Sequence, residues 1–191
     1  MSIKRIPVIF RKNIRDTSET IITAIVIFLI LQLVAQSRVV EGASMAPLLN
    51  QGDRLFVNKL VYTRYPSYLS GYFDKNYHLF HAPERGDVIV FTPPHDYERD
   101  FVKRVIGIPG DVVDIDGAHV YVNGDMVNYP ESITRRVHEN WPIIVPESEY
   151  FVLGDNRELS FDSRNWGSVD ESLIIGKVWV IYWPFGKMKA F

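Results

Sequence analysis

The 191-residue chain contains no cysteine, which excludes disulfide scaffolds, thiolate metal sites and a cysteine nucleophile. Its 21 basic and 23 acidic residues nearly balance, so the overall charge does not favour binding to nucleic acid. The five histidines are scattered, and only His78 and His81 lie close together. Two ligands do not make a zinc site, and no phosphate-binding glycine loop is present. The sequence therefore predicts a protein that needs no metal and no cofactor.

Long uncharged apolar stretches are also absent, except near the N-terminus. Residues 20–37 carry no charge, and a helix of that length would span about 27 Å, close to the ~30 Å hydrocarbon core of a bilayer. The first 19 residues hold five basic and two acidic side chains, so the positive-inside rule places them in the cytoplasm. We predict a cytoplasmic N-terminus (1–19), a transmembrane signal anchor (20–37) and an extracytoplasmic domain (38–191), and hence a single-pass protein of the cytoplasmic membrane.

Two other interpretations of the apolar stretch stay open. A cleavable secretory signal also begins with basic residues and an apolar run. The run here is longer than an ordinary signal sequence needs, and Ala35-Gln36-Ser37 is only a passable cleavage site, which favours an uncleaved anchor. A buried helix of a globular domain is the third interpretation, and the charge asymmetry around the stretch argues against it.

The rest of the chain has the pattern of a β protein. Short runs of β-branched and aromatic residues are bounded by glycine, proline or aspartate, and no comparable stretch has a helical period. The runs predict strands over residues 38–41, 54–59, 87–92, 101–107, 112–115, 119–122, 150–153 and 174–183. The turn dipeptides Asp116-Gly117 and Asn123-Gly124 predict a small meander over residues 112–127. We expect a mainly β, antiparallel domain.

Two insertions interrupt the predicted strands. Residues 61–85 are rich in tyrosine and phenylalanine, and residues 130–148 contain Trp141 and several prolines. Aromatic rings near a membrane anchor are favoured in the lipid interface. An equally good interpretation is that the rings of the first insertion cover an edge of the β core.

Lys103 and Ser44 are the candidates for chemistry. Lys103 and Arg104 are adjacent in a predicted strand, so one of the two cations must share a face with apolar neighbours. If Lys103 points inward, desolvation lowers the pKa of its ammonium group, and a neutral amine can act as a general base. The alternative is a lysine at the sheet rim whose charge reaches solvent. Ser44 follows the predicted anchor, and a Ser–Lys pair is a known variant of triad chemistry.

A polar loop follows the predicted strand at 150–153. Residues 154–167 combine aspartate, arginine, asparagine and serine side chains between two glycines. Asp162 and Arg164 are spaced to pair, which predicts an ordered hydrogen-bond network.

Three groups of segments together resemble the bacterial type I signal peptidases, membrane-bound serine proteases that remove signal peptides from exported proteins. Their order, their spacing and the preceding apolar stretch agree with that family over nearly the whole chain, most closely with its short, single-anchor members. The matching residues are Ser44-Met45-x-Pro47 with Gly52-Asp53-Arg54-Leu55-x-Val57-Asn58-Lys59, then Gly86-Asp87-Val88-Ile89-Val90-Phe91 with Lys103-Arg104-Val105-Ile106-Gly107-x-Pro109-Gly110-Asp111, and Gly154-Asp155-Asn156-Arg157-x-x-Ser160-x-Asp162-Ser163-Arg164-x-Trp166-Gly167.

The resemblance implies a Ser/Lys peptidase architecture that acts on the signal peptides of exported preproteins. Ser44 would be the nucleophile and Lys103 the general base, and Ser160 would hydrogen-bond the lysine amine. The resemblance also implies shallow apolar pockets for small residues in an Ala-x-Ala pattern. The residues expected to shape the site are Asp155, Asp162 and Arg164, and those expected to line the pockets are Met45, Leu49, Phe101 and Val102.

The chain departs from the family pattern at two positions. Gly42 stands where some members have a serine whose hydroxyl helps to hold the oxyanion, so backbone N–H groups, chiefly that of Ser44, would serve here. Leu48 stands where threonine is common.

Two rival functions remain at this stage. A membrane-tethered β module could bind extended peptides by edge-strand addition without needing Lys103. A different Ser–Lys peptidase, such as a self-cleaving repressor or a conjugative-pilus maturation protease, would share the β architecture, but a repressor would carry a DNA-binding head in place of the predicted anchor. No oligomeric state is predicted.

Overall fold

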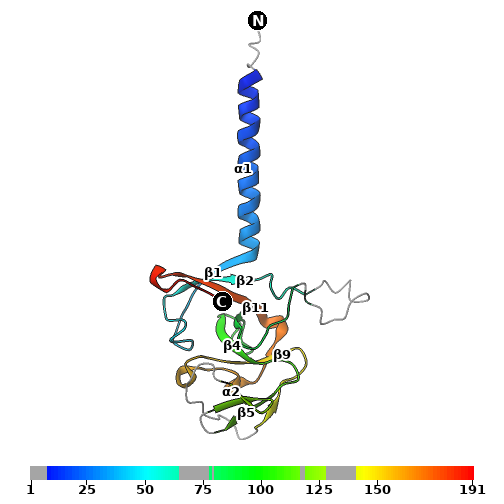
Figure 1. Ribbon diagram of the computed structural model, residues 1–191, viewed down its shortest axis with the longest axis vertical. Coiled ribbons are helices and arrows are strands. Elements are labelled where there is room, and N and C mark those ends of the chain that lie inside the picture. Colours follow the sequence, from blue (N-terminus) through cyan, green and yellow to red (C-terminus); the bar gives the residue numbers. More distant parts are fainter. Residues whose placement is uncertain (1–7, 65–77, 79, 117–118, 128–140) are drawn as a thin grey trace, which may run out of the picture. The chain divides into compact units, whose positions relative to one another are not determined.

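The computed structural model describes residues 8–64, 78, 80–116, 119–127 and 141–191, and the chain divides into two compact units, Met1–Ala35 and Gln36–Phe191 (Figure 1). Most of the aromatic insertion, the Asp116-Gly117 turn beyond residue 116 and residues 130–140 of the second insertion lie outside the described residues, as do residues 1–7 of the predicted N-terminal part.

The first unit consists mainly of helix α1 (Val8–Val34). Among the described residues, no helix combines the length and the apolar character needed to cross a membrane, so the predicted transmembrane span is not supported. Helix α1 ends at Val34, three residues before the predicted end of the span, and strand β1 (Ala35–Val39) begins there.

The second unit is mainly β, as predicted, and the strands from β2 to β12 pair antiparallel within the described residues. In the larger sheet the strands follow the order β1, β2 (Arg54–Asn58), β11 (Ile174–Trp183), β3 (Val88–Phe91), β4 (Phe101–Gly107), β9 (Glu149–Leu153) and β10 (Val169–Asp170), and β12 (Lys189–Ala190) pairs with β11. The smaller sheet has the order β7 (Asp125–Val127), β6 (His119–Val122), β5 (Val112–Asp116) and β8 (Ile143–Ile144).

Strand β3 explains why its sequence is apolar without alternation. All four of its residues are buried, because apolar clusters pack on both faces of the sheet. Val88 and Val90 belong to a cluster that includes Met45, and Ile89 belongs to a cluster with Val105 on the opposite face. The centre of the larger sheet is therefore packed on both faces, and it supports the loops at the edges of the sheet.

Strand β4 is paired on both sides only over part of its length. It pairs with β3 from Phe101 to Arg104, whereas its pairing with β9 begins at Arg104. Residues 101–103 therefore have one edge without a neighbouring strand among the described residues, and the chain after β9 diverges there into the polar loop. This loop contains the short helices η2 (Arg157–Leu159) and α2 (Ser163–Trp166). Two further short 3-10 helices are η3 (Glu171–Leu173) and η4 (Phe185–Lys187).

The predicted meander over residues 112–127 is confirmed as β5, β6 and β7. Its apolar side chains pack with Phe151 of β9 in a third cluster, so the smaller sheet covers the far end of β4 and β9. Other predicted strands agree with the structure to within one or two residues, except that the strand expected at 38–41 starts at Ala35.

Candidate active site

Ser44 lies on a loop that is fixed at both ends. The Val40 N–H donates to the carbonyl of Asp53 at 2.9 Å, and the Leu49 N–H donates to that of Met45 at 2.9 Å. The side chains of Met45 and Leu49 are buried in one apolar cluster, whereas Ser44 is only half-buried. The core thus anchors the residues after Ser44 and leaves its hydroxyl accessible.

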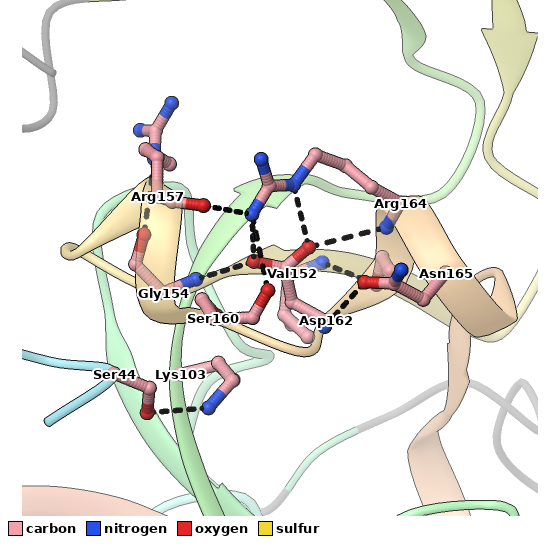
Figure 2. Close-up of polar contacts among 10 residues, drawn as sticks. Ser44, Lys103, Val152, Gly154, Arg157, Ser160, Asp162, Arg164 and Asn165 are labelled. Carbon is pink, nitrogen blue, oxygen red and sulfur yellow. Dashed lines mark hydrogen bonds and ion pairs between the residues drawn. The ribbon is translucent and has the colours of Figure 1, made fainter. Parts of the chain in front are cut away.

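Lys103 reaches this hydroxyl from the middle of β4. Its Nζ lies 2.7 Å from Ser44 Oγ and donates a second hydrogen bond to the carbonyl of Val102 at 3.1 Å (Figure 2). Only 4% of the Lys103 side chain is exposed, so of the two predicted orientations the inward one is found. Residues 59 positions apart in the chain are thereby brought into direct contact.

Burial is the main influence on the Lys103 amine. It lowers the pKa of Lys103 from 10.5 to about 8, while the charges of Asp162 and Asp155 act in the opposite direction. Both carboxylates are already paired with arginines, and this pairing reduces the extent to which they raise the pKa of Lys103. At neutral pH a useful fraction of the amine is therefore uncharged and able to accept a proton.

Each of these carboxylates forms a buried, two-pronged ion pair. Arg104 donates from Nε and Nη2 to Asp155 at 2.8 and 2.7 Å, and Arg164 donates from Nε and Nη2 to Asp162 at 2.8 and 2.9 Å. Asp162 is fully buried and also accepts from the Gly154 N–H at 3.1 Å. The sequence analysis did not single out Arg104 as a site residue, although its place beside Lys103 on a half-buried strand was a usable signal for a second buried charge.

The polar loop has the ordered network that its composition predicted (Figure 2). Asp162 caps the N-terminus of α2, with Asn165 completing a capping box. Arg164 Nη2 donates to the backbone carbonyls of Arg157 at 2.6 Å and Ser160 at 3.3 Å. One buried guanidinium therefore holds both α2 and the backbone of residues 157–160.

Gly154 is where this loop meets the Ser44 loop. A Cβ added at Gly154 would lie 2.2 Å from Ser160 Oγ and 2.5 Å from the Ser44 carbonyl oxygen, well inside any allowed contact. Asn156, two residues after Gly154, binds the same carbonyl: its N–H donates to Ser44 O at 3.0 Å. Only glycine lets the two backbones approach so closely.

The expected hydrogen bond between Ser160 and the lysine amine is not formed in the structure. Ser160 Oγ is buried and has no hydrogen-bond partner among the described residues, because Lys103 Nζ is directed at Ser44 Oγ and at the Val102 carbonyl. Ser160 nevertheless packs at the junction of the two loops, against Gly154.

Ser44 and Lys103 both line a cleft of about 550 Å³. Three of the four residues predicted to line substrate pockets, Met45, Phe101 and Val102, line this cleft. Leu49 is not among the residues that line the cleft, because its side chain is fully buried in the cluster with Met45 beneath the Ser44 loop; its role in a pocket stays a prediction. The cleft also has lining residues that the sequence analysis missed, among them Arg38, Asp100, Leu159 and Phe161.

Most of the chain is similar in sequence to a family of known proteins. The family model described as "Signal peptidase, peptidase S26" matches residues 14–183. The chain belongs to the type I signal peptidase family. The probable signal peptidase I-2 of Synechocystis sp. is 34% identical over 175 residues, which cover 88% of this chain and 73% of that protein. The signal peptidase IB of Staphylococcus aureus is 34% identical over 197 residues, with 92% and 94% covered.

A solved signal peptidase I from Enterococcus faecalis is 33% identical in sequence and has a TM-score of 0.45, covering 51% of this chain and 97% of that one. As a type I signal peptidase, the chain is a serine peptidase that removes signal peptides from preproteins. Family membership decides against the two rivals of the sequence analysis, a peptide-binding module without activity and a Ser–Lys peptidase of another function.

Proposed function

We propose that this signal peptidase cleaves preproteins after small residues, with Ser44 as the nucleophile and Lys103 as the general base. The observation that carries the proposal is the 2.7 Å separation between Ser44 Oγ and the amine of Lys103, a residue that is 4% exposed. Burial supplies the uncharged amine, and the hydrogen-bond distance supplies the path for the proton. Lys103 thus acts as the general base, which is the role of a histidine in the more common serine proteases.

The substrate would bind as an extended strand along the unpaired edge of β4. Residues 101–103 have backbone groups available there, and Met45, Phe101 and Val102 line the adjoining cleft. Their side chains leave shallow apolar space, which suits the Ala-x-Ala pattern implied by the family resemblance. Both the pattern and the assignment of these residues to pockets belong to the proposal.

The chemistry would proceed in two halves. Lys103 takes the Ser44 proton as the oxygen attacks the carbonyl carbon before the scissile bond, and the resulting oxyanion is held by backbone N–H groups, chiefly that of Ser44. The C–N bond breaks as Lys103 returns the proton to the leaving amine, which produces an acyl-enzyme. Lys103 then activates a water molecule that releases the acyl group and restores Ser44.

Removal of either member of the dyad tests this proposal. The full chain in detergent is incubated with a preprotein, and the new N-terminus is located by mass spectrometry. Ser44→Ala and Lys103→Ala are expected to lower kcat/KM by at least about a thousandfold. Ser168→Ala and Lys189→Ala, which lie off the cleft, serve as matched controls. Wild-type activity in either dyad variant would exclude the proposed mechanism.

We also propose that the enzyme acts at a membrane, where its preprotein substrates are found. The apolar side chains of α1 from Ile21 to Leu31 are between 48% and 60% exposed, which is unfavourable in water and suits contact with lipid. Flotation of the full chain with liposomes is expected, and Ile25→Glu with Leu29→Glu should reduce it, whereas Met126→Glu in β7 should not. Equal flotation of all three proteins would contradict a role for α1. The predicted cytoplasmic location of the N-terminus stays a prediction.

A further inference from the structure

Two large apolar side chains in the polar loop stay exposed although the loop is ordered. Leu159 is 68% exposed and Phe161 56%, whereas Asp162 beside them is fully buried. Both line the same cleft as Ser44 and Lys103. Neither takes part in the proposed dyad, and more than half of each side chain's surface is left in water, which is unfavourable for an apolar group.

The backbone that carries these side chains is held from several directions. Arg164 binds the carbonyls of Arg157 and Ser160, and the Leu159 N–H donates to the carbonyl of Asn156 at 3.2 Å. Asn156 in turn binds the Ser44 carbonyl at 3.0 Å. Leu159 and Phe161 are therefore presented at fixed positions relative to the nucleophile, as a contact that discriminates between substrates requires.

The position of the loop indicates which part of a substrate it meets. Under the proposed function, Lys103 must reach the leaving nitrogen as well as Ser44 Oγ, so the residues after the scissile bond lie on the lysine side of the nucleophile. The polar loop meets the Ser44 loop at Gly154, next to Ser160, which stands between the two apolar residues and is drawn with the Ser44–Lys103 pair in Figure 2. Leu159 and Phe161 line the cleft together with Lys103. Under the same proposed function, the small residues before the bond would lie along Phe101 and Val102, which line the cleft together with Leu159 and Phe161.

We propose that Leu159 and Phe161 are specificity-determining residues that contact the first residues after the scissile bond and favour apolar side chains there. This inference rests on the proposed function, because it takes the direction of the substrate from the Ser44–Lys103 chemistry. The selectivity comes from removing apolar surface of both partners from water, which a polar substrate residue does not match. A difference of about tenfold in kcat/KM is the expected size for one such contact.

The test uses two peptides that share an Ala-x-Ala segment before the scissile bond and differ in the two residues after it, Leu-Phe in one and Ser-Gln in the other. The full-length wild type in detergent is expected to cleave the Leu-Phe peptide with about tenfold higher kcat/KM. In the double variant Leu159→Ser, Phe161→Ser this ratio should fall to about one. Ile144→Ser is the matched control, because Ile144 is also 68% exposed but lies on β8, off the cleft, and it should leave the ratio unchanged.

Thermal unfolding and acylation of Ser44 by a serine-directed reagent establish that the double variant is folded. A ratio near one in the wild type, or an unchanged ratio in the double variant, would overturn the specificity proposal while leaving the dyad intact. Cleavage of neither peptide by the wild type, or of both by Ser44→Ala, would instead reject the proposed function.

Discussion

Gly154→Ala is expected to inactivate the enzyme without touching either member of the dyad. The added methyl group would lie 2.2 Å from Ser160 Oγ, 2.5 Å from Ser160 Cβ and 2.5 Å from the Ser44 carbonyl oxygen, where an ordinary contact needs at least 3.4 Å. Relief requires the Ser44 backbone and the polar loop to separate by about 1 Å, and a misplacement of that size can lower catalysis about 100-fold. The 2.7 Å contact between Ser44 Oγ and Lys103 Nζ would then exceed hydrogen-bond distance.

The assay is kcat/KM against one preprotein, together with the midpoint of thermal unfolding. Overpacking at Gly154 should also destabilise the fold by about 1–3 kcal/mol. Gly186→Ala is the matched control, because an added Cβ there meets nothing within 4 Å, and it should leave activity and stability unchanged. The double variant Gly154→Ala, Ser160→Ala removes the contact with Oγ but keeps the one with the Ser44 carbonyl, so it should stay inactive. Full activity in Gly154→Ala would refute the close-approach argument.

Two further predictions follow from the buried charges. Because burial lowers the pKa of Lys103 to about 8 and the neutral amine is the active form, kcat/KM should rise with pH through that value and level off above it; a limb near the ordinary 10.5 would contradict this. Asp162→Asn leaves the Arg164 guanidinium buried without its counter-charge and should destabilise the protein by about 3–5 kcal/mol in urea unfolding. Asp96→Asn breaks the exposed pair with Arg99 and should change stability by less than about 1 kcal/mol, so equal losses would count against the network.

The strand pattern could be predicted because it depends on local properties. Alternating apolar residues bounded by turn formers give β4, β6 and β11 the bounds that the sequence indicated. The end of α1 could not be read in the same way, because the residues at 35–37 have no charge and no strong turn signal. They join the sheet as β1, beside β2, and pairing across the sheet decides this.

For the candidate site, too, some features could be predicted from the sequence and others depended on packing. From the sequence alone, the residue types and their order pointed to a serine, a lysine and a polar loop, because chemistry and family resemblance both attach to individual positions. Whether Lys103 or Arg104 faced inward was decided by packing, since an alternating strand fits either choice until its neighbours are placed. The same holds for Leu49, which the core buries, and for Ser160, whose hydroxyl is buried without a hydrogen-bond partner among the described residues.

The sequence alone determined which chemical groups are available. It has no thiol and few imidazoles, it places Ser44 and Lys103 in the order that the family resemblance requires, and it predicts a mainly β chain that carries them. Only the tertiary structure decided that the Lys103 amine is desolvated, that it lies 2.7 Å from Ser44 Oγ and that Gly154 lets the two loops touch. The reason is physical. A pKa and a proton path depend on distances and solvent exclusion, and both arise from residues that are far apart in the chain and meet only when the sheet closes around them.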